Sequence, residues 1–265
     1  MKVFIAPKLN KPNTQKTLEA VIAKLTELGI EPVTGELKSE ELSACDAVIT
    51  IGGDGTILKI GKIAARAERP LLGINTGRLG FMATLESDEL DKLERLKNGG
   101  YRISRRILLD VVSNSVFDNA LNDVVLHRGA RSKLPMFIVS RNEVEILRVR
   151  ADGIIVGTPT GSTAYSLSAG GAIIEPELEC IVVTALCPHT LFNRSMIFSG
   201  KGWLNISYRD CDGEVFVSVD GGEGEILEEN QIVKIAQSAD YLDLIDIDGN
   251  NFYDSIHNKL MKPLK

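Results

Sequence analysis

The sequence lacks the features that mark membrane, secreted and disulfide-stabilised proteins. No apolar run approaches the ~20 residues needed to span a bilayer, and residues 1–7 read as a first strand rather than as a signal peptide. The chain has only three histidines and four scattered cysteines, with no C-x-x-C pair. Neither a disulfide framework nor a zinc site is therefore predicted, and we expect a cytoplasmic protein with no membrane partner.

The charge balance also excludes a class of partner. The 265 residues include 30 basic and 36 acidic side chains, a net charge of −6. Dedicated nucleic-acid binders usually carry a basic excess, so no nucleic-acid partner is expected. The length and the 44% hydrophobic content predict one large globular domain or two ordinary ones.

Strand-like and helix-like segments alternate over the first hundred residues. Expected strands are 3–6, 47–51 and 70–75, and expected helices are 13–28, 56–67 and 87–97. Gly29 is placed to end the first helix. This alternation predicts an α/β domain over residues 1–100, with a mostly parallel sheet flanked by helices.

Short β-rich segments separated by turns fill most of the remaining chain. The expected strands are 107–113, 121–127, 136–140, 143–150, 153–158, 180–186, 203–209, 214–219, 231–236 and 241–247. One helix is expected over 162–169. The pattern predicts a β-rich, sandwich-like C-terminal domain over 101–250. The tail, 251–265, has a weak pattern that allows it to pack back on the first domain.

The strongest local motif is Gly52-Gly53-Asp54-Gly55-Thr56, between an expected buried strand and a helix. Glycines let backbone amides approach phosphate oxygens, and a helix N-terminus favours negative charge. Asp54 can orient a hydroxyl, accept its proton or help to hold Mg²⁺. The simpler alternative is a tight turn in which Asp54 caps the helix. The loop matches neither the Walker pattern nor the dinucleotide fingerprint, and we favour the phosphate function.

Three further segments carry polar chemistry. Residues 75–81, N-T-G-R-L-G-F, follow another strand and suit phosphate contact as well as an ordinary turn. Residues 152–171 carry five hydroxyl side chains within 158–166, more than helix capping requires, and suit a nucleoside. Asn122 and Asp123 can together bind a pair of ribose hydroxyls, although such a pair is commonly a turn.

Together these segments resemble the NAD kinase family from about residue 47 to 222, and the T-P-T-G-S-T-A-Y stretch is the most specific part. The resemblance implies phosphoryl transfer to the 2′-hydroxyl of the adenosine ribose of NAD, with Asp54 as general base. It implies that Asn122 and Asp123 hold ribose hydroxyls and that Arg150 and Asp152 act near the far half of the dinucleotide. The adenosine pocket would be formed by Thr163, Ala164, Tyr165 and Ser168, with Phe81 beside it. The other expected substrate-binding residues are Gly53, Gly55, Thr56, Lys59, Asn75, Arg78, Thr160, Ser162, Ser166 and Cys187.

The resemblance also implies Mg²⁺ carried with the phosphoryl donor and assembly into homodimers or homotetramers. The donor stays open between ATP, another nucleoside triphosphate and polyphosphate, and NADH stays open as an acceptor. Asp123 stands where the family more often has Glu, and Gly222 where it often has Gln. The shorter Asp123 side chain reaches about one carbon–carbon bond less far.

Two alternatives remain at this level. A lipid or sugar kinase could share only the Asp54 loop, although nothing in 158–171 suits an acyl chain. A non-catalytic nucleotide sensor could keep the fold, although a sensor has no need of the base that Asp54 offers.

Overall fold

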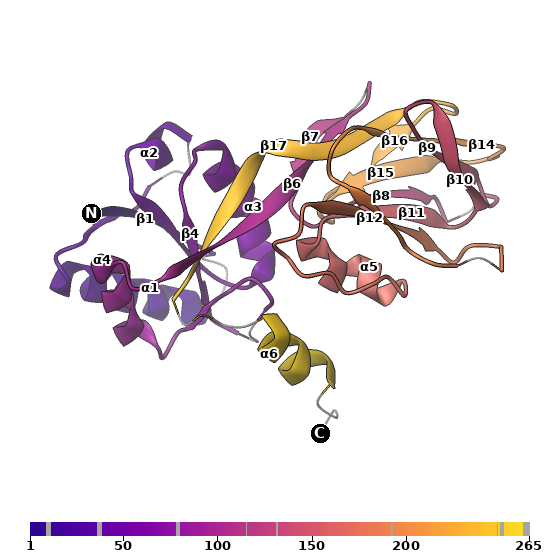
Figure 1. Ribbon diagram of the computed structural model, residues 1–265. Coiled ribbons are helices and arrows are strands. Elements are labelled where there is room, and N and C mark those ends of the chain that lie inside the picture. Colours follow the sequence, from indigo (N-terminus) through magenta and orange to yellow (C-terminus); the bar gives the residue numbers. More distant parts are fainter. Residues whose placement is uncertain are drawn as a thin grey trace. The chain divides into compact units, whose positions relative to one another are not determined.

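The computed structural model describes residues 1–8, 12–35, 39–77, 80–114, 116–130, 132–191, 193–247, 249 and 252–261. The chain divides into two compact units (Figure 1). Unit 1 is Met1–Arg106 with Asp240–Lys265, and unit 2 is Ile107–Ala239. The sequence predicts domain boundaries at residues 100/101 and 250/251. The structure places them at 106/107 and 239/240, so unit 1 includes more residues at both boundaries than expected.

Unit 1 is built on a parallel sheet. Its strands are β1 (Lys2–Pro7), β2 (Glu31–Val33), β3 (Ala47–Ile51), β4 (Leu71–Asn75) and β5 (Leu85–Glu86). They run in the order β2-β1-β3-β4, with β5 beside β4, and all these pairs are parallel. Every residue of β3 and β4 is buried, as their continuous apolar runs predict.

Helices lie on both faces of this sheet, α1 (Pro12–Glu27) on one and α3 (Asp54–Arg66) on the other. The other helical segments of unit 1 are α2 (Ser39–Ser43), the 3₁₀ turn η1 (Leu90–Leu93), α4 (Glu94–Asn98), α6 (Phe252–Ile256) and the π-helical turn η3 (His257–Met261). Val21 and Leu25 of α1 share a core with alternate strand residues such as Ile49. On the other face α3 packs so closely that a Cβ at Gly73 would lie 2.6 Å from Ile57 Cδ1.

Unit 2 is a pair of antiparallel sheets. Its strands are β6 (Arg102–Val112), β7 (Phe117–Ala120), β8 (Asp123–Arg128), β9 (Met136–Arg141), β10 (Val144–Arg150), β11 (Gly153–Gly157), β12 (Cys180–Leu186), β13 (Met196–Ser199), β14 (Leu204–Arg209), β15 (Val215–Val219), β16 (Glu225–Leu227) and β17 (Val233–Asp246). One sheet has the order β13-β12-β11-β8-β15-β16, and the other contains β10-β9-β14-β17. A single core takes side chains from both sheets, which confirms the expected sandwich.

The structure corrects the expected elements in three places. The separate strands at 231–236 and 241–247 are one strand, β17, which pairs with β14 in unit 2 and with β4 in unit 1. Polar residues within 237–240 interrupt the apolar pattern, but the strand continues through them. The helix expected at 162–169 is a 3₁₀ turn, η2 (Thr160–Thr163), followed by the four-residue α5 (Tyr165–Ser168). The helix expected at 87–97 is likewise split between η1 and α4.

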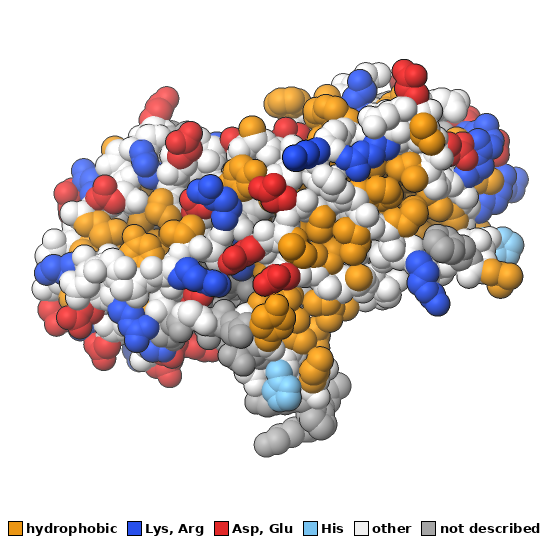
Figure 2. All heavy atoms as spheres, in the orientation of Figure 1, with side chains coloured by type: hydrophobic (Ala, Val, Ile, Leu, Met, Phe, Trp, Pro, Cys, Tyr) orange, Lys and Arg blue, Asp and Glu red, His pale blue; other side chains and the backbone are white. Residues whose placement is uncertain are grey.

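Charges of both signs are mixed on the face shown in Figure 2, where Lys and Arg side chains alternate with Asp and Glu side chains. Within the described part of the chain, no helix is long and apolar enough to cross a membrane.

Candidate active site

The Asp54 loop connects the buried strand β3 to helix α3. Gly53 is the N-cap residue of α3 and makes no side-chain cap hydrogen bond, and Asp54 is the first helical residue. The loop is fixed to the sheet by a hydrogen bond from Gly52 N to Ile74 O, 2.9 Å. Asp54 therefore does not cap the helix, which removes the simpler alternative for this residue.

The Asp54 carboxylate is instead held by the backbone of residues 80–82. Phe81 N donates to Oδ2 at 2.8 Å and Met82 N donates to Oδ1 at 3.2 Å. Gly80 lies so close that an added Cβ would overlap the carboxylate. Two of the roughly four lone-pair sites of the carboxylate are thereby occupied, and the others remain able to accept a hydroxyl proton.

A pocket of about 200 Å³ lies against the same loop. Its lining residues are Lys8, Thr14, Gly52, Gly53, Gly55, Thr56 and Thr76. The Oγ1 atoms of Thr14 and Thr56 are buried and have no hydrogen-bond partner within the described structure. A buried hydroxyl without a partner is costly, so a ligand oxygen there would satisfy both. The ammonium group of Lys8, the hydroxyls of Thr14 and Thr56 and the N-terminus of α3 together suit a phosphate group.

The other residues expected at this loop have different places. Asn75 is buried, and its side chain donates to Gly77 O at 2.8 Å and accepts from Gly77 N at 3.2 Å, so it shapes the turn. Lys59 is exposed on α3 and does not line the pocket. Arg78 lies outside the described residues.

A second cavity, of about 420 Å³, lies in unit 2. It is lined by Asn122, Asp123, Val125, His127, Ala164, Tyr165, Ser218, Asp220 and Gly221. Asp123, Val125 and His127 alternate along β8 and therefore share one face of the sheet. The volume is in the range of small-molecule sites, and the half-exposed Tyr165 offers an aromatic ring beside the polar groups.

Asp220 fixes the backbone at one end of this cavity. Its carboxylate accepts hydrogen bonds from Leu121 N at 2.9 Å, Asn122 N at 2.7 Å and Asp123 N at 3.2 Å. Burial of Asp123, together with the nearby negative charge of Asp220, raises the pKa of the Asp123 carboxyl to about 7. The end of the cavity thus contains two carboxyl groups, of which that of Asp123 titrates near neutrality.

Most hydroxyls of residues 158–166 form hydrogen bonds to other groups of the protein. Thr158 Oγ1 donates to Leu121 O, 2.6 Å, Ser162 Oγ to Pro159 O, 2.6 Å, and Thr163 Oγ1 to Thr160 O, 3.2 Å. Ser166 Oγ pairs with Thr184 Oγ1 at 2.9 Å. The expectation that these hydroxyls form the ligand surface is corrected here, since Ala164 and Tyr165 are the residues of this stretch that line the cavity. Thr160 is buried, and Ser168 is exposed at the end of α5.

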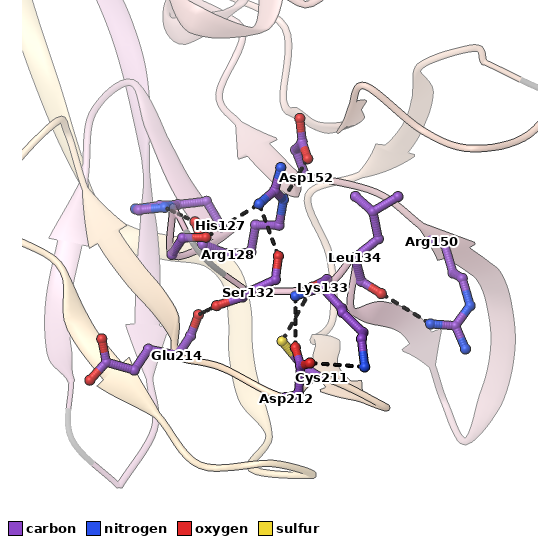
Figure 3. A network of polar contacts seen from close by, with 11 residues as sticks. His127, Arg128, Ser132, Lys133, Leu134, Arg150, Asp152, Cys211, Asp212 and Glu214 are labelled. Atoms are coloured by element: carbon purple, nitrogen blue, oxygen red, sulfur yellow. Dashed lines mark hydrogen bonds and ion pairs between the residues drawn. The ribbon is translucent and has the colours of Figure 1, made fainter.

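Arg150, Asp152 and Cys187 do not line the cavity. Asp152 accepts a 2.7 Å hydrogen bond from Arg128 Nε, and Arg150 donates to Leu134 O at 3.0 Å (Figure 3). Arg150 also donates to Asp210 Oδ2 at 3.1 Å. The charged groups of Arg150 and Asp152 thus make contacts within unit 2. Cys187 is exposed and has a positive φ of 43°.

Sequence reasoning missed several lining residues. Lys8 directly follows β1 and Thr14 lies in the first turn of α1, so no local pattern joins them. Thr76 lies within the segment 75–81, which from its sequence suits phosphate contact. His127, which stacks on Phe216 with ring centroids 5.6 Å apart, is not among the site residues expected from the sequence. A signal for His127 did exist, because it shares its strand face with Asp123.

Comparisons with known proteins agree with this architecture. A family model described as the ATP-NAD kinase N-terminal domain matches residues 5–101, and one described as the ATP-NAD kinase C-terminal domain matches 121–247. The NAD kinase of Caldanaerobacter subterraneus subsp. tengcongensis is 35% identical over 278 residues, 98% of each chain. That of Symbiobacterium thermophilum is 37% identical over 272 residues, 95% of each chain.

Two solved structures share the fold. Yeast NADH kinase complexed with NADH has a TM-score of 0.88 at 24% identity, with 100% of this chain and 89% of that chain covered. An NAD kinase from Archaeoglobus fulgidus in complex with ATP has a TM-score of 0.81 at 24% identity, with 98% and 99% covered. The matches of both domain models and the full-length identity to curated relatives show that this chain belongs to the NAD kinase family.

Proposed function

We propose that this NAD kinase transfers the terminal phosphoryl group of ATP to the 2′-hydroxyl of the adenosine ribose of NAD, giving NADP. The observation that carries the proposal is the Asp54 carboxylate, which the backbone N–H groups of Phe81 and Met82 hold beside the pocket lined by its own loop. Its unoccupied lone pairs allow it to accept the ribose hydroxyl.

Asp54 acts as the general base in this reaction. The proton of the ribose hydroxyl passes to the Asp54 carboxylate, the ribose oxygen bonds to phosphorus, and the bond from phosphorus to the ADP oxygen breaks. A positioned base of this kind contributes roughly 10²–10⁴-fold. Alignment and charge neutralisation at the phosphates, by Lys8 and the loop amides, supply the larger share.

Mg²⁺ is proposed as the divalent cation that enters with the donor. Within the described part of the chain, no group of three or more His, Cys, Asp or Glu side chains could hold a metal. Mg²⁺ commonly keeps several waters and binds substrate phosphates with one or two carboxylates, and Asp54 is the carboxylate that this loop offers. The bound ion would neutralise charge on the donor phosphates.

The cavity of unit 2 is proposed to bind the adenosine of NAD. Tyr165 would pack against the base, while Asn122 and Asp123 would hydrogen-bond ribose hydroxyls. The relatives solved with NADH and with ATP support testing NADH as a second acceptor and ATP as the donor.

Assembly into a homodimer or homotetramer is also proposed. The two edge strands of the six-stranded sheet, β13 and β16, expose Ile197 and Ile226, each about half exposed. Exposed apolar edge strands favour pairing with another chain, and light scattering would measure the mass.

The cytoplasm is proposed as the compartment, since four cysteines without a disulfide suit a reducing environment.

A single-turnover substrate panel tests the activity. The purified protein is mixed with NAD, NADH, diacylglycerol or fructose 6-phosphate, each with ATP or polyphosphate. We expect product from NAD with ATP, phosphorylated at the 2′ position. Phosphorylation of only the lipid or the sugar would overturn the proposal, as would binding of NAD without any turnover.

A further inference from the structure

The C-terminal segment returns a lysine to the turn that holds Asp54. Lys259 lies in η3, within unit 1, and its side chain is half-buried. Its Nζ donates a hydrogen bond to the carbonyl oxygen of Gly80 and lies 4.3 Å from the centroid of the Phe81 ring. Lys259 is thus in contact with both residues of one peptide unit.

That peptide unit connects Lys259 to the base. The Gly80 carbonyl and the Phe81 N–H belong to the same planar peptide group, and the Phe81 N–H is the 2.8 Å donor to Asp54 Oδ2. Because the group is planar, a partner that fixes the carbonyl also fixes the direction of the N–H. An ammonium on the carbonyl oxygen also polarises the peptide and strengthens its N–H as a donor.

The surroundings act on the Lys259 ammonium group in both directions. Burial lowers its pKa below the ordinary value, because the lost hydration outweighs the negative charges of Asp54 and Glu86, which raise it. The carbonyl oxygen and the face of the Phe81 ring both attract a cation and offset part of the lost hydration. A neutral side chain of the same length would keep the packing and lose these attractions.

We propose that Lys259 is a positioning residue for phosphoryl transfer, whose ammonium group orients the Gly80–Phe81 peptide and through it the Asp54 carboxylate. This inference rests on the proposed function of Asp54 as the base. The C-terminal segment would then affect kcat and leave substrate binding unchanged.

The test compares Lys259→Met, Lys259→Arg and the control Asn258→Ala, which changes an exposed residue of the same turn. We expect Lys259→Met to lower kcat roughly tenfold, as for the loss of one hydrogen bond to a charged group, with the KM for NAD unchanged. Lys259→Arg should recover most of the lost kcat, and Asn258→Ala should match the wild type. Normal kcat in Lys259→Met, or a loss that Lys259→Arg does not reduce, would overturn the inference.

A double variant separates positioning from general stability. If Lys259 acts through Asp54, then Lys259→Met should cause no further loss of kcat in an Asp54→Asn background. A further tenfold loss there would show an independent effect and would reject the positioning role. Normal turnover in Asp54→Asn alone would instead refute the base, so the two failures are distinguishable.

Discussion

Gly80 and Asp54 fit against each other so closely that no side chain can stand between them. A Cβ added at Gly80 would overlap the carboxylate of Asp54, which the backbone N–H groups of Phe81 and Met82 hold in place. The glycine is therefore needed for space, and it lies 26 residues away from the aspartate whose position it allows.

Gly80→Ala should displace the carboxylate and break one or both of its hydrogen bonds. We expect kcat to fall about a hundredfold, a loss comparable to that of a positioned base. Steady-state kinetics would measure it against Gly77→Ala, where an added Cβ meets nothing within 4 Å. Equal kinetics in the two variants would contradict this account of Gly80.

Asp54→Asn keeps the shape of the side chain and removes its capacity to accept the ribose proton. We expect kcat to fall by at least about a hundredfold, while NAD binding stays nearly intact because the cavity proposed for adenosine is in unit 2. Calorimetric titration with NAD and a turnover assay would measure the two quantities. Near-normal turnover would remove Asp54 from the mechanism.

Thr14→Val should affect stability and donor binding in opposite directions. The buried Thr14 hydroxyl has no partner within the described structure, so its removal should leave the free energy of unfolding unchanged or raise it by about 1 kcal/mol. The KM for ATP should rise several-fold, because a phosphate oxygen would lose its donor. Thr26→Val on the same helix is the control, since that exposed hydroxyl already bonds Ile22 O at 2.8 Å. An unchanged KM in Thr14→Val would exclude this hydroxyl from the phosphate pocket.

Asp123 should make stability depend on pH. Its pKa is about 7 in the folded protein against an ordinary value of 3.8, so the folded state holds more protons than the unfolded state between these values. The free energy of unfolding should therefore fall as pH rises through that window, by a few kcal/mol in total at about 1.4 kcal/mol per pKa unit. Asp123→Asn should remove this fall, so urea unfolding should show the variant gaining stability over the wild type from pH 5 to pH 8. A difference that stays constant with pH would refute the assignment.

Local patterns were sufficient for much of the framework. The run from Ala47 to Ile51 forms β3 with the expected bounds, because a continuous β-branched stretch suits a strand buried on both faces. The order strand, glycine loop, helix then follows from the chain itself, and so does the position of Asp54. The alternation of Asp123, Val125 and His127 along β8 is likewise a local property.

Other features depended on contacts between distant residues. Ser162 and Ser166 read as ligand hydroxyls, because a sequence does not show that Ile174 N and Thr184 Oγ1 already hydrogen-bond them. The break expected at 237–240 does not occur, because β17, which pairs with β14, β6 and β4, stays extended through the polar residues. In both cases the deciding partner lies elsewhere in the fold.

The sequence alone determined the family, the loop that carries Asp54 and the polar pair Asn122-Asp123, because these lie within short contiguous segments. Only the tertiary structure decided that Phe81 and Met82 hold the Asp54 carboxylate, that Lys8 and Thr14 complete the anion pocket and that Lys259 returns to Gly80. The physical reason is that hydrogen bonds and burial act between atoms brought close by folding, whatever their separation along the chain.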